Sequence, residues 1–162
     1  MKTKRISDNI EKILNTQIAN EMNSSALYRA MGNCLEYSGW NGASKLWKKY
    51  ADEEKGHAEK IISFMQDRDC LPQIPSTDQP QKEFKGLKEI VIASDEHEQK
   101  ITKNWKEIAS MAMKETDLMT FELASWFIQE QREEEMKMIY WIDRIEILKR
   151  KLSLETKCSA CV

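Results

Sequence analysis

The chain has 162 residues, of which 41 % are hydrophobic and 32 % are charged, and its formal net charge is −2. This length predicts one domain over residues 1–162. The near-neutral charge gives no basic footprint for nucleic acid, and no segment approaches the roughly 18 apolar residues of a membrane helix. The basic N-terminus lacks the apolar run of a signal peptide. We therefore expect a cytoplasmic protein with no nucleic-acid or membrane partner.

The apolar residues recur with the 3.6-residue period of helices, and the two-residue alternation of strands is absent. In chain order, we predict helices over about 7–37, 43–70, 86–113 and 118–152. The 3 prolines all fall within 71–85, which we predict to be a loop.

Short links make the first two helices one antiparallel hairpin and the last two another. The loop 71–85 reaches roughly 50 Å when extended, whereas each helix spans roughly 40 Å at 1.5 Å per residue. The loop can therefore cross the whole bundle. The sequence predicts an all-α antiparallel four-helix bundle with one long crossover loop.

One seam along each predicted helix is apolar at both ends and polar near the middle. The seams place one carboxylate of each helix at a core position: Glu21, Glu54, Glu98 and Glu134. A buried carboxylate without a partner costs several kcal/mol or becomes protonated, and no Lys or Arg lies on these seams. Two divalent metal ions would balance the four charges, so we predict a two-metal centre in the core.

The spacing of the polar residues supports the same centre. Glu54 and His57 form the Glu-x-x-His motif of di-iron carboxylate proteins. A shift of 77 residues takes Glu54 to Gln131 and His57 to Glu134, so Gln131 is expected beside the metals. Oxygen-rich sites with one imidazole suit Fe or Mn better than structural Zn, although the spacing leaves Mn and adventitious Zn open.

Four stretches, 20–28, 52–57, 97–99 and 129–135, resemble prokaryotic-type non-haem ferritins of the ferritin-like di-iron superfamily. The resemblance covers about residues 7–150. It implies a ferritin-like bundle that assembles into a 24-subunit homo-oligomeric cage. It further implies a ferroxidase that oxidises Fe(II) with O₂ or H₂O₂ and stores ferric mineral. Lys55 stands where bacterioferritins carry the haem-ligand methionine, so no haem is expected.

The resemblance also implies roles for individual residues. Glu21, Glu54 and His57 would hold the first iron. Glu54 would bridge to a second iron held by Glu98 and Glu134, with Gln131 beside it. An accessory third iron is implied at Glu53, Glu130 and Glu133. Tyr28 would donate an electron during oxidation, or it packs in the core.

Three alternatives stay open. Ferritins usually have a glycine-containing turn and a fifth helix after the fourth, but residues 143–152 contain no Gly or Pro. A shortened fifth helix in 153–162 is therefore an option. A second function is a di-iron oxidase or peroxidase of the rubrerythrin-like class, which stores nothing. A third is a helical interaction module, which would leave the core glutamates unexplained.

Overall fold

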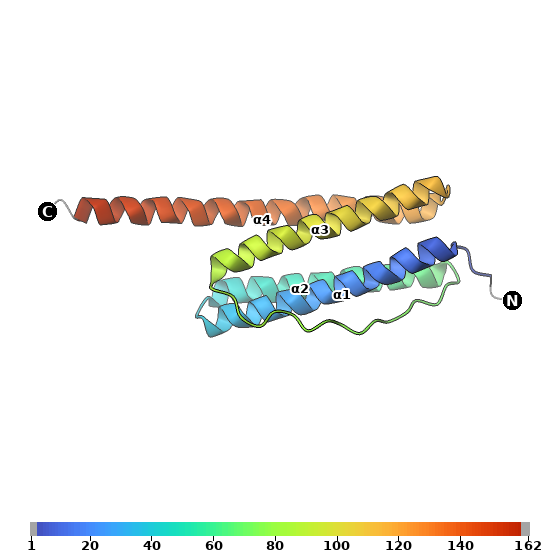
Figure 1. Ribbon diagram of the computed structural model, residues 1–162, viewed down its shortest axis with the longest axis horizontal. Helices are drawn as coiled ribbons and strands as arrows, with labels where there is room; N and C mark the ends of the chain where they lie inside the picture. The colour runs from blue at the N-terminus through green and yellow to red at the C-terminus, as the bar shows by residue number, and fades with distance from the viewer. Residues whose placement is uncertain (1–2, 160–162) are drawn as a thin grey trace.

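The described part of the chain folds into four α-helices (Figure 1): α1 (Asp8–Tyr37), α2 (Asn41–Asp67), α3 (Leu87–Lys114) and α4 (Leu118–Ser159). The computed structural model describes residues 3–159, and their side chains through residue 150. α1 and α2 form one hairpin, α3 and α4 form the other, and α1 also contacts α3. The predicted all-α bundle with one long crossover is confirmed.

Individual residues determine where α1 begins and how the chain turns from α1 into α2. Ser7 caps α1, because its hydroxyl accepts a hydrogen bond of 3.1 Å from the backbone N–H of Ile10. Gly39 has a φ of +82° in the link between α1 and α2, a conformation that glycine adopts without steric cost. This short link fixes the antiparallel direction of the hairpin of α1 and α2.

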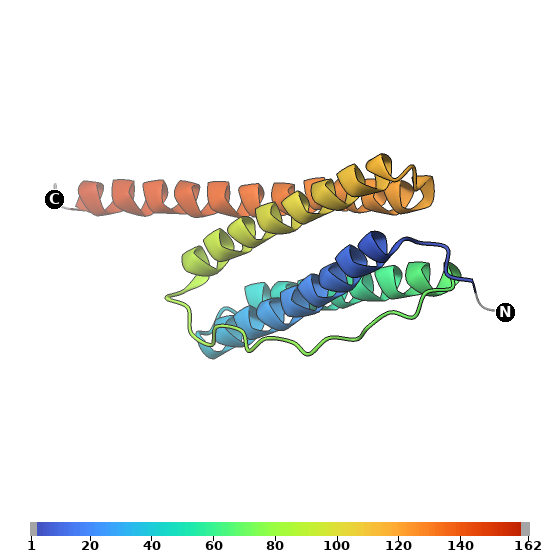
Figure 2. The same cartoon turned by 45° about the vertical axis from the view of Figure 1, so that its right-hand side comes forward.

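The long connection between the hairpins runs along the outside of α1 (Figure 2). It comprises residues 68–86, because α2 ends at Asp67, three residues before the predicted boundary. The backbone N–H groups of Gln73 and Asp78 donate hydrogen bonds of 2.8 Å to the side chains of Asn15 and Asn23. The loop is therefore docked on α1 while it carries the chain from one end of the bundle to the other.

The apolar core is divided into two clusters. One surrounds Trp105 and Phe127, whose rings stack with centroids 3.8 Å apart, and the other surrounds Tyr28 and Trp47. The buried polar residues of the bundle include one group contributed by all four helices: Glu21, Ser24, Glu54, His57, Glu98, Gln131 and Glu134. This polar layer is the feature that the seams predicted.

The fourth helix is longer than predicted. It continues through residues 153–159, which contain neither Gly nor Pro. The suggested fifth helix is therefore not a separate element over these residues, and residues 160–162 lie outside the described part. Its C-terminal part runs past the ends of α1, α2 and α3 (Figure 1). Leu148 lies on the same seam of α4 as Glu134, and the seam predicts that it is buried; it is instead 59 % exposed, so that prediction is wrong. Across the described residues, no helix combines the length and apolar character needed to cross a membrane.

Candidate metal centre

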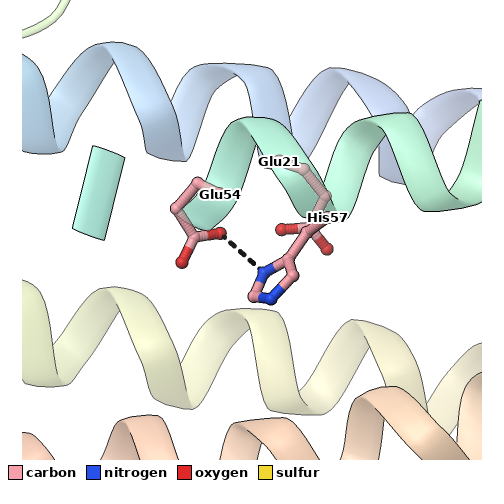
Figure 3. Close-up of side chains that lie close together, drawn as sticks. All are labelled: Glu21, Glu54 and His57. Carbon is pink, nitrogen blue, oxygen red and sulfur yellow. Dashed lines mark hydrogen bonds and ion pairs between the residues drawn. The ribbon is translucent and has the colours of Figure 1, made fainter. Parts of the chain in front are cut away.

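One half of the centre comes from the hairpin of α1 and α2. The ligand atoms of Glu21, Glu54 and His57 all lie within 4.8 Å of one another. Glu54 and His57 share a face of α2 because they are three residues apart, and Glu21 faces them from α1 (Figure 3). His57 Nδ1 lies 3.4 Å from Glu54 Oε2, and its ring packs edge-on against Phe127.

The Glu21 carboxylate has one satisfied and one unsatisfied oxygen. Its Oε1 accepts hydrogen bonds from Gln17 at 2.8 Å and from the Trp105 indole at 3.0 Å. Its Oε2 is buried and has no hydrogen-bond partner. A buried polar atom without a partner costs about 1–3 kcal/mol. A cation beside Oε2 would remove this cost, so the donor set of Glu21, Glu54 and His57 fits a hard divalent ion such as Fe(II).

The other half of the centre comes from α3 and α4. Gln131 donates a hydrogen bond of 2.8 Å to Glu98 Oε2, and the Tyr28 hydroxyl donates to Glu98 Oε1. Both oxygens of Glu98 are thus occupied by donors. This half differs from the first, because its central carboxylate is satisfied within the protein.

Glu134 has a partner that the seams did not contain. The ammonium of Lys137 lies 2.7 Å from Glu134 Oε1 and 3.5 Å from Glu53 Oε2. Although no lysine lies on the seams, Lys137 reaches Glu134 from beside its seam, so this carboxylate has a cationic partner within the protein. In the described structure, Glu130 and Glu133 join no three-residue cluster of metal-ligating side chains. The accessory site at Glu53, Glu130 and Glu133 stays a prediction.

The burial of these carboxyl groups changes their acidity. Burial and the nearby Glu54 raise the pKa of Glu21 to about 8, against the hydrogen bond from Gln17. Burial raises the pKa of Glu98 to about 7, despite the hydrogen bonds from Tyr28 and Gln131. Burial and the neighbouring Glu98 raise the pKa of Glu54 well above its usual value. Near neutral pH, the metal-free layer therefore retains protons that a cation would displace.

Two further residues contribute to the centre through contacts that the sequence did not indicate. Trp105 lies at a buried core position of α3, and its indole N–H donates to Glu21. His97 lies 2.7 Å from the Ser24 hydroxyl and packs edge-on against Tyr28, with ring centroids 5.9 Å apart. Burial lowers the pKa of His97 to about 4, so its imidazole is neutral. The shift of 77 residues that relates Tyr28 to Trp105 was the available signal for Trp105.

The raised carboxyl pKa values predict how the stability of the metal-free protein depends on pH. Above pH 6.5 the unfolded chain has ionised these groups, while folded Glu21 and Glu98 still bind protons. The free energy of unfolding should therefore fall between pH 6.5 and 8.5. Below pH 6.5 the depressed pKa of His97 has the opposite effect, because unfolding allows that imidazole to bind a proton.

Calorimetry in the presence of a chelator checks this dependence. The unfolding midpoint should drop by several °C across pH 6.5–8.5, since 1 kcal/mol corresponds to roughly 2–4 °C in a domain of this size. Glu21→Gln should make the unfolding midpoint depend less on pH. Zn(II), added once the chelator has been removed, should raise the midpoint of the unsubstituted chain at pH 8. A midpoint that rises through this range would contradict the assignment of protonated core carboxyls.

The indole of Trp105 predicts a measurable effect on cation binding. Trp105→Phe keeps an aromatic ring beside Phe127 but removes the donor to Glu21. Loss of such a supporting hydrogen bond typically lowers metal affinity by about 10–100-fold. Titration calorimetry with Co(II) measures this change. Trp47→Phe is the matched control, because that indole donates to Ser94 at 3.1 Å, and an equal loss of affinity in both variants would refute the role.

Comparison with known proteins agrees with this geometry. A ferritin-like domain model matches residues 11–148. A probable bacterial non-heme ferritin-like protein of Haemophilus influenzae is 32 % identical over 88 % of this chain and 87 % of its own length. A bacterial non-heme ferritin of Escherichia coli O157:H7 is 34 % identical over 85 % of this chain and 83 % of its own length.

A solved structure of the same class superposes closely. It is an open pore ferritin from the hyperthermophilic archaeon Archaeoglobus fulgidus, with a TM-score of 0.88 and 28 % identity, and the match covers 96 % of both chains. The bundle, the buried carboxylate layer and the sequence matches agree. The chain therefore belongs to the ferritin-like domain family, in which its named relatives are bacterial non-haem ferritins.

Proposed function

We propose that this protein is an iron-storage ferroxidase that oxidises Fe(II) to Fe(III) at a two-iron centre in its core. The observation that carries the proposal is the buried group of Glu21, Glu54 and His57, in which Glu21 Oε2 has no partner within the protein. A bundle stabilised only by its own contacts gains nothing from such a group. A protein that takes up cations gains a preformed set of ligands.

The proposed ligands divide between the two hairpins. Glu21, Glu54 and His57 hold the first Fe(II), and Glu54 also reaches the second. Glu98 and Glu134 hold the second Fe(II), and Gln131 lies beside it. The burial of all four glutamates, each at most 5 % exposed, supports these roles. Their four charges exceed the single charge of Lys137, and bound cations would balance the rest.

The proposed reaction takes one electron from each Fe(II). With O₂ as the acceptor, two electrons and two protons give H₂O₂. With H₂O₂ as the acceptor, the O–O bond breaks, and two electrons and two protons give two water molecules. Protons displaced from the core carboxyls when Fe(II) binds are one source of those protons. Tyr28, whose hydroxyl donates to Glu98, is assigned the supply of one electron in place of one Fe(II) when a single Fe(II) is bound, so that the acceptor still receives two electrons.

Storage requires an assembly, which we propose to be a cage of 24 copies in the cytoplasm. The relatives named bacterial non-heme ferritin and the superposed open pore ferritin support this part of the proposal. Exposed apolar side chains support it independently. Tyr37 is 96 % exposed and Leu71 is 86 % exposed, and contacts with further copies would cover such side chains.

A non-storing oxidase of the rubrerythrin-like class is the second candidate. The observation in its favour is the straight course of α4 to Ser159, in place of a turn and a separate short helix. Such an enzyme would use the same carboxylate layer without a mineral store. The two candidates therefore differ in assembly and in the amount of iron retained.

Removal of a core ligand predicts a loss of oxidation rate. Aerobic addition of Fe(II) to the unsubstituted protein should produce a near-ultraviolet ferric band in a stopped-flow spectrometer. Glu54→Ala should slow this band by about 100-fold or more, since even supporting residues are worth about 10–100-fold. Glu59→Ala is the control, because Glu59 is an exposed carboxylate of the same helix. Equal rates in the two variants would refute the site.

Particle size and iron content distinguish storage from simple oxidation. After loading with many Fe(II) per subunit, the storage protein should elute with the mass of about 24 subunits and carry iron far beyond two ions per chain. Size-exclusion chromatography with light scattering and iron analysis measures both quantities. A monomer or dimer that retains two irons or fewer would favour the non-storing oxidase.

A further inference from the structure

Lys137 is a partly exposed cation that α4 places at the edge of the acidic layer. Its ammonium lies 2.7 Å from Glu134 Oε1 and 3.5 Å from Glu53 Oε2. It also lies 5.1 Å from the centroid of the Tyr50 ring, within the range of a cation–π contact. Glu134 belongs to α4 and Glu53 to α2, so this one side chain joins the two hairpins.

The two carboxylates depend on Lys137 to different extents. Glu53 has a second partner, because Lys49 lies 2.9 Å from its other oxygen. For Glu134, Lys137 is the only basic side chain in ion-pair contact within the described structure. The Glu134 side chain is 6 % exposed, so water replaces little of what Lys137 provides. Lys137 therefore neutralises a buried carboxylate that has been assigned to iron.

A metal ion and this ammonium exclude each other between Glu53 and Glu134. Both need the same carboxylate oxygens, and two like charges a few ångströms apart repel strongly in a partly buried site. The first ion does not meet this conflict, because in the described structure no lysine contacts Glu21, Glu54 or His57. The second ion shares only Glu134 with Lys137, which pairs with one of the two carboxylate oxygens of that residue. The conflict is greatest at the accessory position, which needs both Glu53 and Glu134.

We propose that Lys137 takes the place of an accessory third metal ion and limits tight divalent-cation binding to two ions per subunit. This inference rests on the proposed function, because it takes Glu134 as an iron ligand. Lys137 is then a specificity-determining residue. In the metal-free protein, its ammonium forms ion pairs with Glu53 and Glu134. The same positive charge repels a further cation from the position between these two carboxylates.

The charge of Lys137 is tested by Zn(II) titration calorimetry on the metal-free full-length protein, since Zn(II) binds without redox chemistry. The unsubstituted protein should bind two ions tightly per subunit. Lys137→Met should bind a third ion at least about tenfold more tightly than the unsubstituted protein does. Lys137→Arg, which retains the positive charge, should bind two Zn(II) ions tightly per subunit. Lys49→Met, the matched control for Glu53, should also bind two, because Lys49 does not contact Glu134.

A second substitution locates the third ion. In Lys137→Met, the added change Glu53→Gln should abolish third-ion binding and leave the first two ions in place. Without metal, the Lys137→Met protein should unfold at a lower temperature than the unsubstituted protein. Zn(II) should raise the unfolding temperature of Lys137→Met by more than it raises that of Lys49→Met. Lys137→Gln repeats the test with a polar side chain if Lys137→Met does not assemble.

The outcomes separate the two proposals. Two ions in every variant, with unchanged affinity for a third, would overturn the role of Lys137 and leave the ferroxidase proposal standing. A purely structural role would lower the unfolding temperature of Lys137→Met without changing the number of ions. Absence of tight binding in the unsubstituted protein would instead overturn the proposed function.

Discussion

The structure depends on one electrostatic constraint, the burial of four carboxyl groups in the middle of an apolar bundle. Glu21, Glu54, Glu98 and Glu134 divide the core into two apolar clusters, so the packing of each hairpin is interrupted at the same level. Without cations, the layer retains protons, as the raised pKa values of Glu21 and Glu98 show. The stability of the fold and the affinity for cations are therefore two measures of one interaction.

Much of the fold and of the polar layer was predictable from the sequence. An α-helix repeats every 3.6 residues, so residues spaced alternately by three and four lie on one face. This rule predicts that Glu21 and Glu54 face the core of the bundle, and both are buried there. The same rule failed for Leu148, because periodicity says which face a residue occupies but not whether another helix lies opposite it. The end of α4 was also underestimated, since residues 153–159 lack a breaker but carry little apolar pattern.

The features that the sequence did not predict are contacts made by long side chains. Lys137 follows Glu134 by three residues, so the two side chains are neighbours on α4, and the four methylene groups of the lysine let its ammonium reach that carboxylate although Lys137 lies off the seam. Trp105 was correctly expected to be buried, but periodicity does not show where an indole N–H points. The metal-binding roles proposed for Glu21, Glu54 and the other polar core residues rest on chemistry and family resemblance, whereas the side chains that contact those residues required the three-dimensional structure.

The two halves of the centre differ in how many carboxylate oxygens already have partners within the protein. This difference bears on which half of the centre a cation would occupy first. On α1 and α2, Glu21 Oε2 has no partner, so a cation gains a ligand there without breaking a hydrogen bond to it. On α3 and α4, both oxygens of Glu98 accept hydrogen bonds, and Glu134 is paired with Lys137. A cation at that half must displace these partners. In the proposed centre, we therefore expect the first ion to bind between α1 and α2, and we expect its charge to weaken the pairing of Lys137 with Glu134 before the second ion binds.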